Sequence, residues 1–355
     1  MSIPKSARIY VAGHGGLVGS AIMEALHDRG FSHLITRTKH ELDLTNQNAV
    51  NEFFALEQPE YVILAAAKVG GIMANSLYPA DFIHENIAIA MNVIHASHQH
   101  GVKKLINLGS SCIYPKFADQ PIKENSLLTG ILEPTNEPYA IAKIAAIKLC
   151  TSYHKQFGSN FISLMPTNLY GSRDNYHLEH SHVIPAIIRK CFLAKYLAEG
   201  NVDAIKRDLS IGVPKHWTLN DDADIIKNLE SIGITANTLT LWGTGKAQRE
   251  FLHARDLADA IVFALEHINA NEEDACINIG TGQDETIHDI AHLIASLVGY
   301  SGMIAFDSTK PDGTPRKVMN VDRAKELGWK YSIELHDGLA SIIEEYRLKG
   351  PQNAR

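Results

Sequence analysis

Three shortages in the sequence each exclude a class of protein. The 355 residues include four cysteines, which lie too far apart for a Cys-x-x-Cys redox pair or a metal knuckle. The formal net charge is −7, whereas a nucleic-acid or anionic-membrane surface requires a basic excess. No apolar run approaches the roughly 18 residues that span a bilayer. We therefore expect neither a nucleic acid nor a membrane as a partner.

Metal-ligating side chains are not clustered either. The 18 histidines are scattered without a His-Glu-x-x-His or similar motif, so we predict no metal site. Residues 1–5 show no signal-peptide pattern before the first apolar segment, and we expect a cytoplasmic protein. What is present is an ordinary globular composition, 45% hydrophobic and 21% charged, with enough length for about two domains.

A glycine-rich turn between a predicted strand and a predicted helix indicates a nucleotide-binding fold. Residues 8–13 have the pattern of a short buried strand, and a helical pattern follows over residues 21–29. Between them, Gly13, Gly16 and Gly19 have the spacing Gly-x-x-Gly-x-x-Gly, which is typical of short-chain or extended dehydrogenases. The glycines permit a tight turn and let a pyrophosphate approach the helix N-terminus. A plain glycine turn is the alternative.

Basic residues after the second predicted strand favour NADP over NAD. The strand at residues 33–36 is followed by Arg37 and Lys39. An acidic residue at this position binds the ribose 2′-hydroxyl of NAD, whereas a basic one accommodates the 2′-phosphate of NADP. The alternative is that both side chains belong to a solvated strand end.

Alternating strands and helices predict an α/β fold with a Rossmann-like, doubly wound parallel sheet and a smaller C-terminal α/β substrate domain. The predicted strands are continuous apolar runs, which suit strands covered on both faces of a parallel sheet. They include residues 61–67, 104–109 and 161–165, with helices over 47–57, 79–98 and 138–155. We predict an NADP-binding domain at 1–165, to which about 238–280 returns, and a mainly substrate-binding region at 166–355.

Two segments have no assigned chemistry. Residues 197–237 are polar, with one predicted helix at 224–231, and we interpret them as an insertion on the surface or at a dimer contact rather than an active-site lid. The predicted helix at 79–98 has a wide apolar face, which belongs either to the core or to a subunit interface.

A hydroxyl, a thiol, a phenol and an ammonium fall between Ser110 and Lys143. Tyr139 and Lys143 share a face if their segment is helical, and Pro138 favours the first helical turn. The ammonium would stabilise a phenolate and lower the pKa of Tyr139 toward the working range. Because Ser110 and Cys112 follow a strand of the predicted sheet, we expect them at the edge where ligands bind. The alternative is an exposed pair on an ordinary amphipathic helix.

Six motifs make the chain resemble the extended short-chain dehydrogenases/reductases. Within that family it resembles the NADPH-dependent epimerase/reductases that convert GDP-4-keto-6-deoxy-D-mannose to GDP-L-fucose. The resemblance covers nearly all of the chain except 197–237. The motifs are Gly-Ser-Ser-Cys-Ile-Tyr-Pro (109–115), Glu-Pro-Thr-Asn-Glu-Pro-Tyr-Ala-Ile-Ala-Lys (133–143), Met-Pro-Thr-Asn-Leu-Tyr-Gly (165–171), Ser-His-Val-Ile-Pro (181–185), Trp-Gly-Thr-Gly (242–245) with Arg-Glu-Phe-Leu-His (249–253), and Lys-Pro-Asp-Gly-Thr-Pro-Arg-Lys (310–317).

The resemblance implies a role for each motif, and also a homodimer. Ser110, Tyr139 and Lys143 would form the catalytic triad, and Cys112 and His182 the acid/base pair of epimerisation. The implied substrate-binding residues are Lys190, Trp242, Arg249 and Asp312. The implied cofactor-binding residues are Gly13, His14, Gly15, Gly16, Leu17, Val18, Gly19, Arg37, Lys39, Leu108, Gly109, Ser110, Ser111, Lys143, Pro166, Thr167, Asn168, Leu169 and His182.

Several alternatives stay open at this point. Instead of a catalytic role, Cys112 could be a small buried residue of the core, and His182 could cap a helix. Gly15 stands where relatives often have arginine, which removes one phosphate contact. The insertion before Trp242 leaves open a 4-ketoreductase, with or without epimerisation, acting on another GDP-4-keto-deoxysugar or a GDP-heptose. A non-catalytic NADP-binding regulator is a third candidate, although a regulator would need none of the reactive side chains.

Overall fold

The computed structural model describes residues 3–271, 276–310 and 312–351. Pro311, in the motif at 310–317, lies outside them. The chain divides into two compact units. Unit 1 consists of Met1–Leu169, Glu250–Gly282 and Val318–Ser332, and unit 2 of Tyr170–Arg249, Gln283–Lys317 and Ile333–Arg355. The return to unit 1 therefore begins at Glu250 and not near 238, because residues 238–242 pair with a strand of unit 2.

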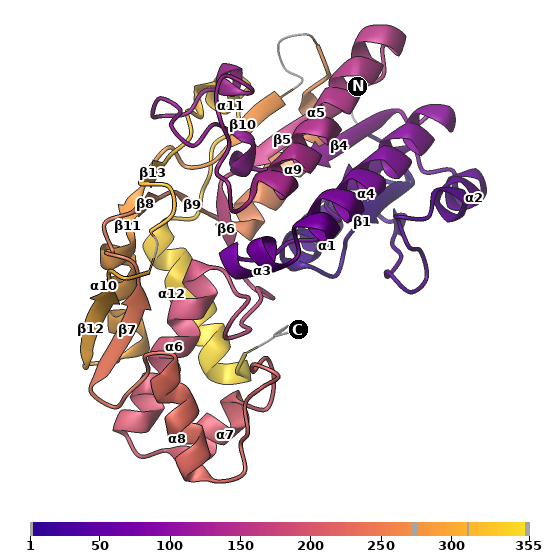
Figure 1. Cartoon of the computed structure of the whole chain (residues 1–355). Coiled ribbons are helices and arrows are strands. Elements are labelled where there is room, and N and C mark those ends of the chain that lie inside the picture. Colours follow the sequence, from indigo (N-terminus) through magenta and orange to yellow (C-terminus); the bar gives the residue numbers. More distant parts are fainter. Residues whose placement is uncertain (1–2, 272–275, 311, 352–355) are drawn as a thin grey trace. The chain divides into compact units, whose positions relative to one another are not determined.

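Unit 1 contains a parallel sheet, which confirms the predicted Rossmann-like fold (Figure 1). Among the described residues it has six strands in the order β10-β5-β4-β3-β1-β2. Neighbouring strands are parallel throughout. The bounds are β1 Ile9–Ala12, β2 Leu34–Ile35, β3 Tyr61–Leu64, β4 Lys104–Leu108, β5 Phe161–Pro166 and β10 Cys276–Ile279.

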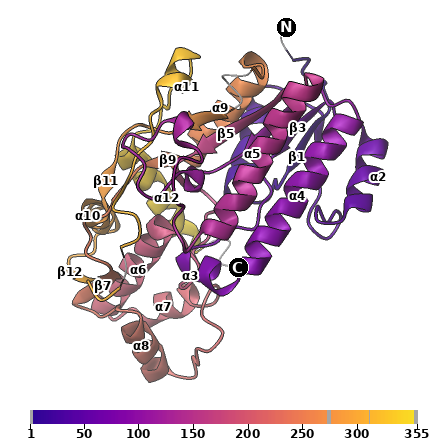
Figure 2. The same ribbon diagram turned by 45° about the horizontal axis from the view of Figure 1, so that its top comes forward.

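Helices cover both faces of this sheet, which is why its strands lack polar alternation. Ile9 and Val11 point into one core, packed against α1 and α9. Tyr10 and Ala12 point into the other, beneath α2, α4 and α5. Figure 2 shows α4 and α5 side by side over the sheet. The bounds are α1 Leu17–Asp28, α2 Gln47–Glu57, α3 Ile72–Leu77, α4 Pro79–Gln99, α5 Glu137–Phe157, α9 Ala254–His267 and α11 Asp322–Glu326.

Unit 2 consists mainly of helices around short strand pairs. β7 (Thr238–Trp242) runs parallel to β12 (Met303–Asp307). β8 (Gln248–Arg249) lies between β11 (Glu285–Thr286) and β13 (Arg316–Lys317). The helices are α6 Val183–Ala198, α7 Val202–Asp208, α8 Asp222–Ser231, α10 Ile287–Val298 and α12 Leu335–Lys349. A further short pair belongs mostly to unit 1 and consists of β6 (Asn168–Tyr170) and β9 (Phe251–His253).

The segment at 197–237 differs from its prediction. It contains two helices, α7 and α8, where one was expected. It also reaches the core of unit 2, because the Asp208 carboxylate accepts a 2.8 Å hydrogen bond from Nε of the fully buried Arg189. Tyr346 of α12 donates to the same carboxylate. Such long-range partners leave no periodic signal in the sequence, so a short polar helix looked like a surface insertion.

No helix within the described ranges combines the length and the apolar character that crossing a membrane would take.

Candidate active site

The glycine loop after β1 has the geometry that a pyrophosphate requires. Gly13 has φ +87°, and a Cβ there would lie 2.7 Å from the Ala66 nitrogen. A Cβ on Gly19 would lie 2.0 Å from the Gly13 carbonyl oxygen, so both positions need glycine. Helix α1 begins at Leu17 without a side-chain cap on its first N–H groups. Unpaired N–H groups and the helix dipole favour an anion at this point.

The predicted 2′-phosphate residues already have acidic neighbours. The Arg37 guanidinium forms an ion pair with Glu57 and lies 5.4 Å from the centre of the Phe53 ring. The Lys39 ammonium is 3.4 Å from Oε2 of Glu85. Sequence reasoning missed both acids, because they come from helices α2 and α4. A bound 2′-phosphate would therefore share these cations with carboxylates.

Ser110 follows the fully buried strand β4 and begins the 3-10 turn η1, Ser111–Ile113. The Cys112 N–H donates a 3.2 Å hydrogen bond to Oγ of Ser110. This contact keeps the two residues together at the carboxyl end of the sheet, as the sequence predicted. Cys112 is half-buried and forms no disulfide with the described cysteines, whereas Cys150 and Cys191 are buried.

Tyr139 and Lys143 lie one turn apart on α5, with the Lys143 ammonium 5.8 Å from the centre of the Tyr139 ring. The Lys143 ammonium donates a 2.7 Å hydrogen bond to the Leu108 carbonyl. Burial lowers the pKa of Lys143 to about 8.

The pKa of the Tyr139 phenol is raised, whereas the sequence predicted a lowered value. Burial raises the pKa of Tyr139, the neighbouring Cys112 raises it further, and a hydrogen bond with Ser110 opposes the rise only in part. The Lys143 ammonium donates its hydrogen bond to the Leu108 carbonyl. Tyr139 is therefore a protonated donor at neutral pH.

The segment after β5 is held by a residue that sequence reasoning did not select. Thr167 donates its N–H to the Ile279 carbonyl at 3.1 Å. The side chains of Thr167 and Asn168 both donate to the main-chain carbonyl of Glu250, at 3.2 and 2.8 Å. Glu250 is part of the motif at 249–253, and no local pattern links it to Thr167 and Asn168, which lie 83 and 82 residues earlier.

Three of the predicted substrate residues lie together in unit 2. The Arg249 guanidinium donates to the Asp312 carbonyl at 3.3 Å. The Asp312 carboxylate accepts from the N–H and hydroxyl of Thr244, at 2.6 and 2.7 Å. Trp242 begins the same turn, is 54% exposed and has the Lys310 ammonium 5.6 Å from its ring centre. A cation, an acid and an exposed ring are suited to a nucleoside diphosphate.

The other two residues of unit 2 lie on α6. His182 is the N-cap residue of α6, and its exposed ring makes no capping hydrogen bond, so the helix-cap alternative does not describe it. The Lys190 ammonium donates to the Ile232 carbonyl at 3.2 Å, and burial lowers its pKa to about 8.

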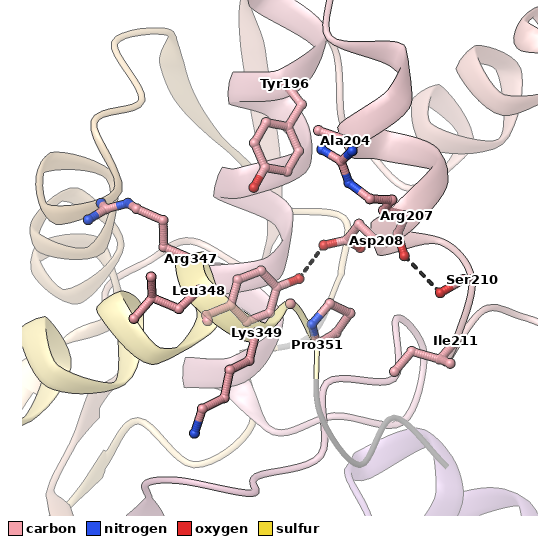
Figure 3. Close-up of a pocket in the computed structure, with 12 residues that line it drawn as sticks. Tyr196, Ala204, Arg207, Asp208, Ser210, Ile211, Arg347, Leu348, Lys349 and Pro351 are labelled. Atoms are coloured by element: carbon pink, nitrogen blue, oxygen red, sulfur yellow. Dashed lines mark hydrogen bonds between the residues drawn. The ribbon is translucent and has the colours of Figure 1, made fainter.

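A cavity of about 290 Å³ in unit 2 contains none of the predicted substrate residues. It lies between α6, α7 and α12 (Figure 3). On its wall the Tyr346 hydroxyl donates to the Asp208 carboxylate, and the Ser210 hydroxyl donates to the Arg207 carbonyl at 2.8 Å. The bond from Tyr346 ties the segment at 197–237 to α12, whereas the bond from Ser210 lies within the segment.

Known proteins resemble this chain over most of its length. The family model described as NAD dependent epimerase/dehydratase family matches residues 9–208 and 222–280, so only 209–221 interrupt the match. GDP-L-fucose synthase 1 of Arabidopsis thaliana is 50% identical over 342 residues, 96% of this chain and 94% of that protein. GDP-L-fucose synthase of Escherichia coli K12 is 48% identical over 343 residues, 95% of each chain.

A solved structure shows the same fold. The GDP-mannoheptose C4 reductase of Campylobacter jejuni, solved with NADP bound, superposes with a TM-score of 0.87 at 41% identity, covering 97% of this chain and 99% of that one. The predicted family is confirmed, since GDP-L-fucose synthases are among the relatives of this chain. The chain belongs to the NAD dependent epimerase/dehydratase family.

Proposed function

We propose that this chain is an NADPH-dependent epimerase/reductase that converts GDP-4-keto-6-deoxy-D-mannose to GDP-L-fucose. The observation that carries the proposal is its 48% to 50% identity, over nearly the full length of both chains, to proteins named GDP-L-fucose synthase. Further support comes from unit 1, where Ser110 and Cys112 follow β4 and the Lys143 ammonium, one helical turn from Tyr139, donates to the Leu108 carbonyl at the end of β4.

The cofactor is NADP, and the residues of unit 1 fit it. The cradle of Gly13 and Gly19 and the uncapped start of α1 suit its pyrophosphate, and Arg37 and Lys39 suit its 2′-phosphate. Gly15 leaves open space where relatives often have arginine, since no atom lies within 4 Å of a Cβ built there. NADPH, when bound, supplies the hydride that reduces C4 of the sugar.

Epimerisation is assigned to Cys112 and His182. A ketone at C4 acidifies the protons on the flanking carbons C3 and C5. One of the two groups removes such a proton from one face of the ring, and the other returns a proton to the opposite face. The carbon therefore keeps one hydrogen while its configuration is inverted. Ser110 and Tyr139 donate hydrogen bonds to the C4 oxygen and stabilise the enolate.

In the reduction step, Tyr139 is the proton donor. As hydride arrives at C4, the Tyr139 hydroxyl gives its proton to the C4 oxygen and the product is an alcohol. The raised pKa of Tyr139 keeps that proton in place until it is needed. Lys143 stabilises the phenolate that remains. In unit 2, Arg249 with Lys190 binds the diphosphate, and Trp242 with Asp312 binds the remaining GDP-sugar.

A second candidate is a 4-reductase of a GDP-heptose. The observation in its favour is the 41% identity to the Campylobacter reductase, which is lower than the identity to GDP-L-fucose synthases. Incubation with GDP-4-keto-6-deoxymannose and NADPH in deuterated water separates the two. We expect NADPH consumption with deuterium at both C3 and C5 of the product. Absence of NADPH consumption contradicts the first function, and consumption without deuterium identifies a simple 4-reductase.

We also propose that the protein is a cytoplasmic homodimer that binds neither nucleic acid nor membrane. The net charge of −7 supports the absence of nucleic-acid and anionic-membrane partners, which require a basic excess. Exposed apolar side chains along α4 support the dimer, among them Tyr78 before its start and Met91.

A further inference from the structure

A fully buried carboxylate in unit 1 belongs to no reactive group of the proposed mechanism. Glu250 has no exposed surface. Its Oε1 accepts hydrogen bonds from the N–H groups of Thr281 and Gly282, at 2.6 and 2.8 Å. Its Oε2 accepts from the N–H of Met319 at 2.8 Å. The Thr281 hydroxyl is a further donor, 3.4 Å from Oε1. Burial raises the pKa of Glu250, and the hydrogen bonds from the backbone N–H groups oppose that rise, because they stabilise the ionised carboxylate.

The main chain of the same residue holds a third segment. The Glu250 carbonyl accepts from Nδ2 of Asn168 at 2.8 Å and from Oγ1 of Thr167 at 3.2 Å. One residue therefore connects the ends of β5 and β10 with the segment around Met319, and it does so from both its main chain and its side chain.

All of these contacts lie beside places where the chain leaves or enters unit 1. Asn168, Glu250, Gly282 and Met319 are each within two residues of such a passage. The chain passes between the units at 169–170, 249–250, 282–283, 317–318 and 332–333. Glu250 thus sets the main-chain positions from which four of these five passages start.

We propose that Glu250 is a positioning residue for hydride transfer. It holds Asn168, and through the main chain Arg249, in the geometry that the reaction requires. The inference rests on the proposed function, in which Asn168 borders the nicotinamide and Arg249 binds the diphosphate. A buried carboxylate with three N–H partners suits this role, because displacement of reacting groups by about 1 Å costs roughly a hundredfold in rate.

Two variants disturb the carboxylate in independent ways. Glu250→Gln keeps the shape of the side chain but replaces one acceptor oxygen by an NH2 group that faces a backbone N–H. Gly280→Ala keeps Glu250 itself, but its new Cβ would lie 2.2 Å from Oε1 and so displaces the carboxylate. The matched control is Asp259→Asn on α9, whose carboxylate binds Arg29 and accepts from Nε1 of Trp329 at 2.9 Å.

Amide hydrogen exchange and single-turnover kinetics provide the readouts. In both variants we expect faster exchange at Thr281, Gly282 and Met319. We expect hydride transfer at saturating NADPH and GDP-4-keto sugar to fall about tenfold to a hundredfold. The dissociation constant of NADPH alone should stay within about threefold, because the glycine loop is untouched. Asp259→Asn should leave the exchange of these amides and the transfer rate unchanged.

A merely structural role gives a different result. Folded variants whose saturated transfer rate is within about twofold of wild type overturn the proposal, as does NADPH affinity that falls in proportion to the rate. The wild-type protein provides a test that needs no variant: NADPH should slow exchange at the three amides, and unchanged exchange overturns the proposal. This arm needs no sugar, so it separates failure of the inference from failure of the proposed substrate.

Discussion

Among single residues, Tyr139 tests the proposed chemistry most directly. Tyr139→Phe removes only the hydroxyl that we propose as the proton donor to the C4 oxygen. Loss of a positioned general acid typically costs about 10²- to 10⁴-fold, so we expect NADPH consumption at saturating substrate to fall by that amount. The comparison is made at a temperature where circular dichroism shows both proteins folded. Turnover within a few-fold of wild type would exclude Tyr139 as the donor.

We expect deprotonation of Lys143 to limit activity at alkaline pH. Burial lowers its pKa to about 8, whereas the pKa of Tyr139 is raised, so the ammonium is the group that loses its proton first as pH increases. Loss of that charge removes the stabilisation of the phenolate. We therefore expect kcat/KM for NADPH oxidation to decline with a one-proton slope above a pH of about 8. A profile that stays flat until pH reaches about 10, the ordinary range of tyrosine and lysine, contradicts this assignment.

Cys112 separates the two reactions. Cys112→Ser replaces the proposed acid/base thiol by a hydroxyl of similar size. We expect deuterium exchange at C3 and C5, followed by NMR in deuterated water, to slow by about 10²-fold or more, with a smaller loss in NADPH consumption. His182 and Tyr139 remain intact in this variant. Equal losses in both measurements would refute the division of labour.

Among elements, the pairing of α6 with α7 tests how the segment at 197–237 is held. The side chains of Arg189 and Asp208 are 0% and 3% exposed. Asp208→Asn leaves the guanidinium as an uncompensated buried charge, which typically costs about 3–5 kcal/mol in the free energy of unfolding. Denaturant titration measures the loss. The control is Asp222→Asn, whose pair with Lys206 is half exposed and should change stability by less than about 1 kcal/mol.

A small effect of Asp208→Asn would show that the Arg189 pair does not anchor this segment. The sequence predicted one helix in this segment, whereas the structure has two, α7 and α8. The sequence of α7 is polar, and its two anchoring partners come from α6 and α12, which are 19 and 138 residues away. By contrast, α2 begins and ends where predicted, because Asn46 caps its N-terminus by accepting from the Ala49 N–H and its apolar positions recur at helical spacing.

For the whole molecule, the proposed homodimer depends on the exposed face of α4. Met91 lies on this helix and is 54% exposed. A carboxylate buried there in an interface is strongly unfavourable, so Met91→Glu should weaken the dimer by about tenfold or more in sedimentation velocity experiments. Leu56→Glu is the control, since Leu56 is 81% exposed at the end of α2. A Met91→Glu protein that stays dimeric at nanomolar concentration would place the interface elsewhere.

The sequence by itself determined the features that depend on neighbours in the chain. The glycine spacing, the helical spacing of Tyr139 and Lys143, and the apolar strands are local patterns, and they were enough for the Rossmann-like sheet and for the reactive groups at its edge. Tertiary structure decided what burial and distant partners control. It paired Arg37 with Glu57, raised the pKa of Tyr139 where a lowered value was expected, and gathered four chain passages around Glu250. Desolvation and contacts between distant segments exist only after folding, so no local pattern records them.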